Sequence, residues 1–360
     1  MNSEYQNKRE PLVSVIVNNY NYARFLGEAI DSALNQTYER VEVIVVDDGS
    51  IDDSRGVIES YGERIKAIYK RNGGQASAMN AGFTIARGEL IYFLDADDIA
   101  APDCLERVVE SYLSAENSIA LLNFRLQLIN DQGEPLEQSA PVEGVALPSR
   151  AISKQIREKG TFRHQPTSAN VFAKYALKKI MPIPAAEFRI CAETYLCYYA
   201  PLFGDIEAVE EILGFYRVHE NNNYHQANKI YDAAGIAEYV GRQADFYSAI
   251  ETSRRRLGKL ANLQIGGNAN LLHLIFKSAN RKLTKNAAGG KNSSNLQSAI
   301  ETLREFRANA QSFSQKRKIA AMLYLSTLQF LPKRMICPLV EMTFIRSPKP
   351  LDFLLRKSLK

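Results

Sequence analysis

Residues 88–98 read GELIYFLDADD, and this stretch decides the fold class. Its middle, residues 90–94, is an apolar run without alternation, which is typical of a strand buried on both faces of a sheet. Two similar runs stand earlier, LVSVIV at residues 12–17 and VEVIVV at residues 41–46, and a short candidate strand covers residues 65–69. The first hundred residues therefore predict a sheet that is covered on both sides.

Helical patterns alternate with these strands. Apolar residues recur at helical spacing across residues 25–34, and further helices are expected at residues 53–61, 75–86 and 102–113. Parallel strands need a crossover connection, which is usually a helix. The alternation thus predicts an α/β, Rossmann-like and mostly parallel sheet with helices on both faces.

The pattern changes after this region. An apolar run at residues 120–129, followed by the turn residues NDQG, indicates a β-hairpin, and a loop rich in Pro, Glu and Ser is expected up to residue 149. Short strands and helices are mixed over residues 160–216, and only helical patterns are found beyond about residue 230. The sequence predicts two parts, an α/β domain at residues 1–235 and an α-helical C-terminal extension at residues 236–360.

Polar residues follow each predicted strand of the first hundred residues. NNYNY follows the first strand, DDGS the second, RNGGQ the third and DADD the fourth. The carboxyl ends of parallel strands meet at one edge of a sheet, where ligands of open α/β folds bind. We therefore expect a polar ligand site at this edge.

Three carboxylates, those of Asp95, Asp97 and Asp98, fall within four residues. Their mutual repulsion favours a bound cation, and Mg²⁺ or Mn²⁺ would prefer such oxygen ligands and bridge to phosphates. Glycines ahead of a helix, here Gly73 and Gly74, also let the backbone approach a phosphate. A solvated helix cap or an ordinary turn is the simpler alternative for each of these motifs.

Four ordered blocks of residues 13–98 resemble the nucleotide-sugar-binding half of family 2 glycosyltransferases with the GT-A fold. They read VSVIVNNYN, VEVIVVDDGSIDDS, NGGQASAMNAG and GELIYFLDADD. Two later stretches are also similar to the family, FRICAETYL at residues 188–196 and GFYRVHENNN at residues 214–223. The resemblance covers about residues 10–225 and implies a GT-A fold and a nucleotide-sugar-dependent transferase.

The resemblance implies roles for individual residues on the donor side. For Asp97 it implies a ligand of Mn²⁺ or Mg²⁺, and for His219 a residue that completes the metal or diphosphate contact. A plain surface position is the alternative for His219. The implied contacts to the nucleotide sugar are Asn19 and Tyr20 in the nucleoside pocket, Asp48 with or without Asp47 on the base, Asn72, Gly73 and Gly74 along the nucleotide, Asp95 on the ribose side and Arg217 against the diphosphate charge.

Glu193 is the catalytic base that the resemblance implies. The family more often has Asp at this position, whereas this chain has Glu after Ala192, and Glu187 is the nearest rival. The implied reaction is an inverting transfer, in which the carboxylate takes the proton of the attacking hydroxyl and the metal neutralises the departing UDP. Residues 165–170 are expected to line the acceptor side.

Other functions remain open at this stage. A sugar nucleotidyltransferase shares a similar sheet, but its Gly-rich loop after the first strand is absent from residues 18–22. A non-catalytic glycan-binding relative is the other alternative, although the carboxylates that catalysis needs are all present. The expected acceptor is a hydroxyl of a glycan or lipid-linked molecule in polysaccharide or glycoconjugate biosynthesis. Neither the sugar nor the acceptor can be named from the sequence.

The net charge of +5 is distributed unevenly. Residues 311–360 carry ten Lys and Arg against two acids, or +8, so the first 310 residues carry −3. A nucleic-acid partner is therefore not expected. The apolar run at residues 319–331 is too short to span a bilayer, and its basic flanks suit either an anionic membrane surface or a helical subdomain packed on the core. Without a signal-peptide pattern, we expect a cytoplasmic protein with peripheral contact to the inner face of the membrane.

Overall fold

The computed structural model describes residues 10–150, 164–220, 222, 248 and 252–253. These residues hold the predicted α/β part. Apart from three residues, the predicted helical extension lies outside the described residues, as do the boundary at residue 235 and the basic tail, so these stay predictions. None of the helices in the described residues combines the length and the apolar composition needed to cross a bilayer.

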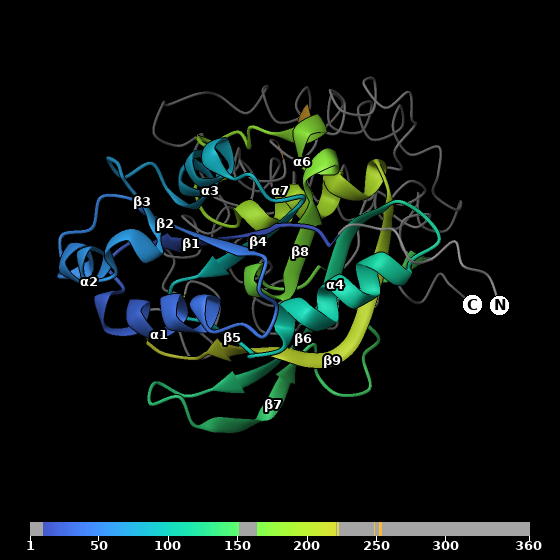
Figure 1. Cartoon of the computed structure of the whole chain (residues 1–360), viewed down its shortest axis with the longest axis horizontal. Coiled ribbons are helices and arrows are strands. Elements are labelled where there is room, and N and C mark those ends of the chain that lie inside the picture. Colours follow the sequence, from blue (N-terminus) through green and yellow to red (C-terminus); the bar gives the residue numbers. More distant parts are fainter. Residues whose placement is uncertain (1–9, 151–163, 221, 223–247, 249–251, 254–360) are drawn as a thin grey trace, which may run out of the picture. The chain divides into compact units, whose positions relative to one another are not determined.

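A nine-stranded mixed sheet is the centre of this unit (Figure 1). Its spatial order is β3-β2-β1-β4-β8-β6-β9-β5, and β7 pairs with β6 off this path. The strands are β1 (Val13–Asn19), β2 (Val41–Asp47), β3 (Lys66–Tyr69), β4 (Leu90–Asp95), β5 (Ile99–Ala100), β6 (Ile119–Ile129), β7 (Pro135–Ala140), β8 (Asn170–Ala173) and β9 (Asp205–Arg217).

Strands β3, β2, β1 and β4 are parallel, as the sequence predicts. Beyond β4 the sheet is mixed, because β8 runs antiparallel to both of its neighbours while β6 and β9 pair in parallel. The predicted α/β class with a mostly parallel sheet is confirmed. The loop expected after the hairpin turn is partly wrong, since β7 continues the hairpin there and pairs with β6.

Helices cover both faces of the parallel strands (Figure 1). Val13, Val15 and Val17 of β1 belong to the same buried cluster as Leu26 of α1. On the opposite face, a Cβ added to Gly82 of α3 would lie 2.4 Å from Cγ2 of Ile16, so this helix packs closely against β1. The helices are α1 (Ala23–Leu34), α2 (Ser54–Ser60), α3 (Gln75–Ile85), α4 (Cys104–Ser114), α6 (Lys174–Ile180) and α7 (Ala192–Tyr199), with the 3₁₀ turns η2 (Gly62–Arg64), η3 (Thr167–Ala169) and η4 (Ala200–Leu202).

The short strand β5 decides where the polar loops meet. It follows the DADD loop directly, and its two residues pair with Phe215 and Gly214 of β9. Because Arg217 and His219 come just after this pairing, the end of β9 is held beside the loop that follows β4. Residues from the first hundred and from beyond residue 210 thus form one edge.

Candidate active site

Asp47, at the end of β2, is buried, and its carboxylate is hydrogen-bonded by neighbouring residues. Its Oδ1 accepts hydrogen bonds from Asn19 Nδ2 at 2.9 Å and from the Ser50 hydroxyl. Gly49 has a φ of +81°, and a Cβ there would lie 2.7 Å from the backbone nitrogen of Asn72. Glycine is required at this turn, which packs directly on the loop after β3.

The Asp48 carboxylate organises the loop after β3. It accepts hydrogen bonds from the backbone N–H groups of Gly73 at 3.0 Å and Gly74 at 2.6 Å, and from Lys70 Nζ. Both of its oxygens are therefore engaged in holding the glycine loop. The structure thus brings Asp48, Gly73 and Gly74 together, as predicted for the nucleotide side, but through contacts among themselves.

The exposed residues of the predicted donor side lie around these loops. Tyr20, which follows β1, is 44% exposed. Asn72 is exposed, and its Oδ1 accepts a hydrogen bond from an Arg189 Nη2 donor. Their side chains are accessible to a nucleotide, whereas Asn19 and the two aspartates are buried beneath.

Asp95 ends β4 among polar partners. Its Oδ1 accepts hydrogen bonds from Asn18 Nδ2 at 2.6 Å and Gln75 Nε2 at 3.2 Å. Its own backbone N–H donates to the Ser168 hydroxyl at 3.1 Å, which places the stretch at residues 165–170 beside this carboxylate. Burial and the negative charge of Asp97 raise the pKa of Asp95 to about 7.

Asp98 lies beneath the other two carboxylates. It is 1% exposed, and its Oδ1 accepts a hydrogen bond from the Arg217 backbone N–H at 3.0 Å. Burial and the charges of Asp97 and Asp95 raise the pKa of Asp98 well above its ordinary value. Its Oδ2 has no hydrogen-bond partner within the described residues. The loop after β4 thus gathers three carboxylates in a buried setting.

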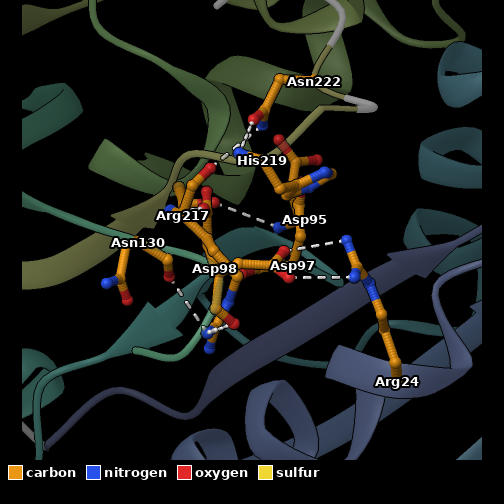
Figure 2. A network of polar contacts seen from close by, with 10 residues as sticks. Arg24, Asp95, Asp97, Asp98, Asn130, Arg217, His219 and Asn222 are labelled. Atoms are coloured by element: carbon orange, nitrogen blue, oxygen red, sulfur yellow. Dashed lines mark hydrogen bonds and ion pairs between the residues drawn. The ribbon is translucent and has the colours of Figure 1, made fainter. Parts of the chain in front are cut away.

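The guanidinium of Arg217 is hydrogen-bonded to other groups of the protein (Figure 2). Its Nε donates to the carbonyl of Asp97 at 3.0 Å, and its Nη groups donate to Glu28 at 2.7 Å and to the carbonyl of Asp131 at 3.1 Å. It also lies 4.6 Å from the ring centroid of Phe25, and the residue is 1% exposed. This placement does not support the predicted contact with a diphosphate and instead favours a role in holding the Asp97 loop.

Asp97 and His219 form the pair expected of a metal site (Figure 2). Nε2 of His219 lies 3.0 Å from Oδ2 of Asp97, and the imidazole ring packs on Phe25 at a centroid distance of 5.0 Å. Asn222 holds the His219 backbone N–H, while its own amide donates to the Arg217 carbonyl at 3.0 Å. His219 is therefore an ordered, buried residue and not a surface histidine.

A divalent cation fits this pair. The described residues contain no group of three or more His, Cys, Asp or Glu side chains arranged around one metal position. A cation here would take two protein ligands, leaving its other positions to water and phosphate oxygens, as is common for Mg²⁺. The unpartnered oxygen of Asp98 and the crowded carboxylates also fit a site that receives positive charge.

Glu193 is the second residue of α7 and is 8% exposed. Burial and the charge of Asp95 raise the pKa of Glu193 to about 8. Such a carboxylate suits a general base, whose best pKa is close to the working pH. The rival Glu187 is exposed on the segment before α7. Burial at the start of α7 and the raised pKa therefore favour Glu193 over Glu187.

Four polar residues of this site were given no role of their own by the sequence reasoning: Asn18, Gln75, Ser168 and Tyr216. Burial raises the pKa of Tyr216, and the negative charges of Asp98, Asp97, Asp95 and Glu193 raise it further. Asn18 and Gln75 had a signal, because they lie in the polar loops after the first and third strands. Ser168 belongs to the stretch at residues 165–170 that was expected on the acceptor side, but its contact with Asp95 depends on segments distant in sequence.

Comparisons of the sequence point to one family. The sequence model of glycosyl transferase family 2 matches residues 14–180. An uncharacterized glycosyltransferase of Nostoc sp. is 37% identical over 219 residues, which cover 60% of this chain and 67% of that protein. An uncharacterized glycosyltransferase of Rickettsia felis is 41% identical over 133 residues, which cover 36% of this chain and 22% of that protein. The chain thus spans about a fifth of the Rickettsia protein.

Solved structures show the same fold. Crystal structures of S. aureus TarS 1-349 in complex with UDP and with UDP-GlcNAc match with TM-scores of 0.54 and 0.52, at 14% identity. The UDP complex match covers 93% of both chains, and the UDP-GlcNAc complex match covers 92% of both. This likeness confirms the GT-A-like α/β architecture.

Proposed function

Since the chain belongs to glycosyl transferase family 2 and is a nucleotide-sugar-dependent glycosyltransferase, we propose that it is inverting and metal-dependent. The proposed donor is a UDP-sugar, a choice supported by the UDP and UDP-GlcNAc complexes of the TarS fold relative. The proposed acceptor is a hydroxyl of a glycan or lipid-linked molecule in polysaccharide or glycoconjugate biosynthesis. Membership of this family disfavours a sugar nucleotidyltransferase.

One observation carries the proposal. Residues from three distant parts of the chain gather at the carboxyl edge of the parallel strands. They are Asp95 and Asp97 at and just after the end of β4, Glu193 in α7 and His219 after β9. Asp97 and His219 suit a cation and a diphosphate, whereas Glu193 has the raised pKa of a base. A non-catalytic relative would have no use for a buried carboxylate beside a metal pair.

In the proposed donor complex, the loops after β1, β2 and β3 hold the nucleoside. Tyr20 and Asn72 offer accessible side chains, and the glycine loop held by Asp48 lets the backbone run close to the nucleotide. Asn19 and Asp47 support these loops from below. Asp95 contacts the ribose side, and Asp97 and His219 hold the cation. When bound, Mn²⁺ or Mg²⁺ neutralises negative charge on the departing diphosphate.

Transfer itself needs one proton acceptor. The acceptor hydroxyl oxygen bonds to the anomeric carbon of the donor while its proton passes to the Glu193 carboxylate. The bond from the anomeric carbon to the diphosphate oxygen breaks, and its electron pair leaves with the nucleoside diphosphate. A single displacement of this kind inverts the anomeric configuration, and it needs no covalent nucleophile.

The experiment is a donor panel. Purified protein is incubated with UDP-sugars and with other nucleotide sugars, with Mn²⁺, Mg²⁺ or EDTA, and hydrolysis and transfer are followed by mass spectrometry. The proposal predicts turnover of a UDP-sugar that stops in EDTA. A protein that turns over no donor and does not bind UDP would be a non-catalytic relative, and the proposal would be rejected.

The basic tail is proposed to contact the inner face of a membrane. Ten cations in residues 311–360 give a net charge of +8, which suits an anionic bilayer. Co-sedimentation with anionic vesicles at low salt tests this proposal, and binding should fall in vesicles of zwitterionic lipid. Absence of binding to either type of vesicle would reject the proposal and favour the alternative, a tail packed on its own protein.

A further inference from the structure

Gln75 joins two parts of the site that are distant in sequence. Its Nε2 donates to Asp95 Oδ1 at 3.2 Å and to the Thr167 hydroxyl at 3.1 Å. Its Oε1 accepts the backbone N–H of Ala192 at 2.9 Å. Ala192 is the first residue of α7, and the next residue is Glu193. One amide group thus contacts the donor-side carboxylate and the helix that carries the proposed base.

The partners fix the orientation of this amide. The backbone N–H of Ala192 can only donate a hydrogen bond, so it needs an acceptor on Gln75. The amide nitrogen must therefore face Asp95 and the amide oxygen must face Ala192. A flipped amide would place donor against donor and acceptor against acceptor, so both bonds would be lost at once.

The start of α7 needs such an outside partner. The first N–H groups of a helix have no acceptor within the helix, and Cys191, before α7, has a φ of +65° and makes no side-chain cap. The oxygen of Gln75 supplies an acceptor from another element. The backbone N–H of Gln75 also donates to the carbonyl of Arg189 at 2.8 Å, so α3 holds the segment leading into α7 at two points.

We propose that Gln75 is a positioning residue that sets helix α7, and with it Glu193, in register with Asp95. This inference rests on the proposed function, because it takes Glu193 as the base. Transfer needs the acceptor oxygen held about 3–3.5 Å from the anomeric carbon of the donor and correctly oriented. The planar amide of Gln75 bonds to Asp95 and to the start of α7, so it fixes the distance between Glu193 and the donor site.

The test is a double-mutant cycle of transfer rates. Gln75→Met keeps the side-chain length but removes all three side-chain hydrogen bonds, and we expect kcat to fall about tenfold, the effect of one well-placed interaction. In the Glu193→Gln background, measured in single turnover with enzyme in excess, the same change should alter the rate by less than about twofold. A residue that acts only on overall stability would give the same loss in both backgrounds.

Gln36 offers a matched control. Its Oε1 accepts the backbone N–H of Leu105 near the start of α4 at 2.9 Å, and its Nε2 donates to the carbonyls of Ser32 and Ala101. Gln36→Met therefore removes a comparable set of hydrogen bonds at a helix that carries no site residue. We expect a similar fall in melting temperature as in Gln75→Met, with kcat unchanged within about twofold.

The outcomes separate the two claims. If Glu193→Gln transfers at the parent rate, the base assignment fails and the inference fails with it. If Glu193→Gln transfers much more slowly than the parent but Gln75→Met lowers the rate by the same factor in both backgrounds, only the inference is overturned. Should Gln75→Met not fold, Gln75→Glu replaces it in the same cycle, since it keeps an acceptor opposite Ala192 but removes the N–H donors to Asp95 and Thr167. Its loss of rate should again be absent in the Glu193→Gln background, and an equal loss in both backgrounds would overturn the inference.

Discussion

His219 Nε2 lies 3.0 Å from Asp97 Oδ2, although 122 residues separate the two along the chain. The Asp97 side chain is 12% exposed and that of His219 is 1% exposed, so only one member of the pair reaches solvent. Under the proposed function, a cation and a diphosphate would approach the accessible edge of Asp97. The imidazole behind it packs on Phe25 and Tyr22, which holds the ring in place.

Asp97→Asn should remove metal-dependent donor binding, because an amide offers a cation a neutral and weaker ligand. We expect UDP affinity measured with Mn²⁺ to fall at least about tenfold, and UDP affinity in EDTA to change little. Isothermal titration calorimetry in both buffers measures this. Asp131→Asn is the matched control, since Asp131 pairs with Arg24 at the edge of the same loops. An unaltered response to Mn²⁺ in Asp97→Asn would exclude this residue as the ligand.

Transfer should become faster with rising pH. Burial and Asp95 raise the pKa of Glu193 to about 8, so the group is a neutral acid at lower pH and becomes the required carboxylate above it. The charged and titratable groups near it are Asp95, Tyr216 and Cys197, with His164 bonded to Thr194. A plot of kcat/KM against pH, which reports the free enzyme, should therefore rise and level off above about pH 8.

Glu193→Gln should abolish this pH dependence together with most of the transfer. Loss of a general base costs about 10²–10⁴ in rate, while UDP binding should persist. Glu187→Gln is the control, because Glu187 is an exposed carboxylate close in sequence. Retained transfer in Glu193→Gln, with loss in Glu187→Gln, would exchange the roles of the two residues.

Gly74→Ala should both destabilise the fold and weaken nucleotide binding. Gly74 has a φ of +84°, and an added Cβ would lie 2.4 Å from the backbone oxygen of Arg189. Gly62 has a φ of +53° with no atom within 4 Å of an added Cβ, so Gly62→Ala has the backbone strain without the clash. Urea unfolding should show a loss of about 1 kcal/mol for Gly62→Ala and about 2–4 kcal/mol for Gly74→Ala. Equal losses would mean that the segment after Phe188 moves away freely.

Arg217→Met should lower the free energy of unfolding by about 2–4 kcal/mol, since buried carbonyls of Asp97 and Asp131 lose their donors. Arg107 makes comparable ion pairs at the surface, with Glu110 and Glu211. Arg107→Met should therefore cost no more than about 1 kcal/mol. Thermal and urea unfolding of both variants measure the difference, and a surface-like value for Arg217→Met would contradict a role in holding the Asp97 loop.

Glu42 should make stability depend on acid pH. Burial alone would raise its pKa, but hydrogen bonds from Lys66, Ser14 and Arg87 outweigh burial and lower the pKa to about 2. The carboxylate therefore contributes stability that is fully present above about pH 4.5 and is lost as the pH falls toward 2. Between pH 5 and pH 2.5 the parent should lose about 1–3 kcal/mol more than Glu42→Gln.

The control for Glu42 is Glu59, whose pair with Arg55 lies on the surface of α2. Glu59→Gln should change the free energy of unfolding by less than about 0.5 kcal/mol at any of these pH values. If the parent and Glu42→Gln lose stability in parallel from pH 5 downward, the hydrogen bonds of Glu42 contribute nothing to folding.

The local sequence pattern was sufficient to predict the secondary structure of the first half of the domain. Apolar runs and helical spacing predicted β1, β2, β3 and β4 with the helices between them, because each of these signals lies within about ten residues. The same locality placed Asp95 and Asp97 at a strand end. Asp47 and Asp48 were also placed at the correct edge, but not their bonding to Ser50 and to the glycine loop.

The remainder depends on pairing between distant segments. β5 has two residues, too few for any periodicity, and its partner β9 lies more than a hundred residues later. The burial of Arg217 beneath the Asp97 loop follows from that pairing, whereas the resemblance implied a contact with the diphosphate charge. Gln75 is the first residue of α3, and nothing in the local pattern distinguishes it from an ordinary helix start.

The pairing of β5 with β9 also sets an order on biosynthesis. A chain made from its N-terminus releases the four parallel strands early, and these can pair while the ribosome still holds the rest. Until β9 emerges, β6 lacks its parallel neighbour and Asp97 lacks His219. The nascent protein therefore has the loops after β1, β2 and β3 before Asp97 meets His219. Under the proposed function, metal-dependent donor binding would begin only after residue 219 has been added.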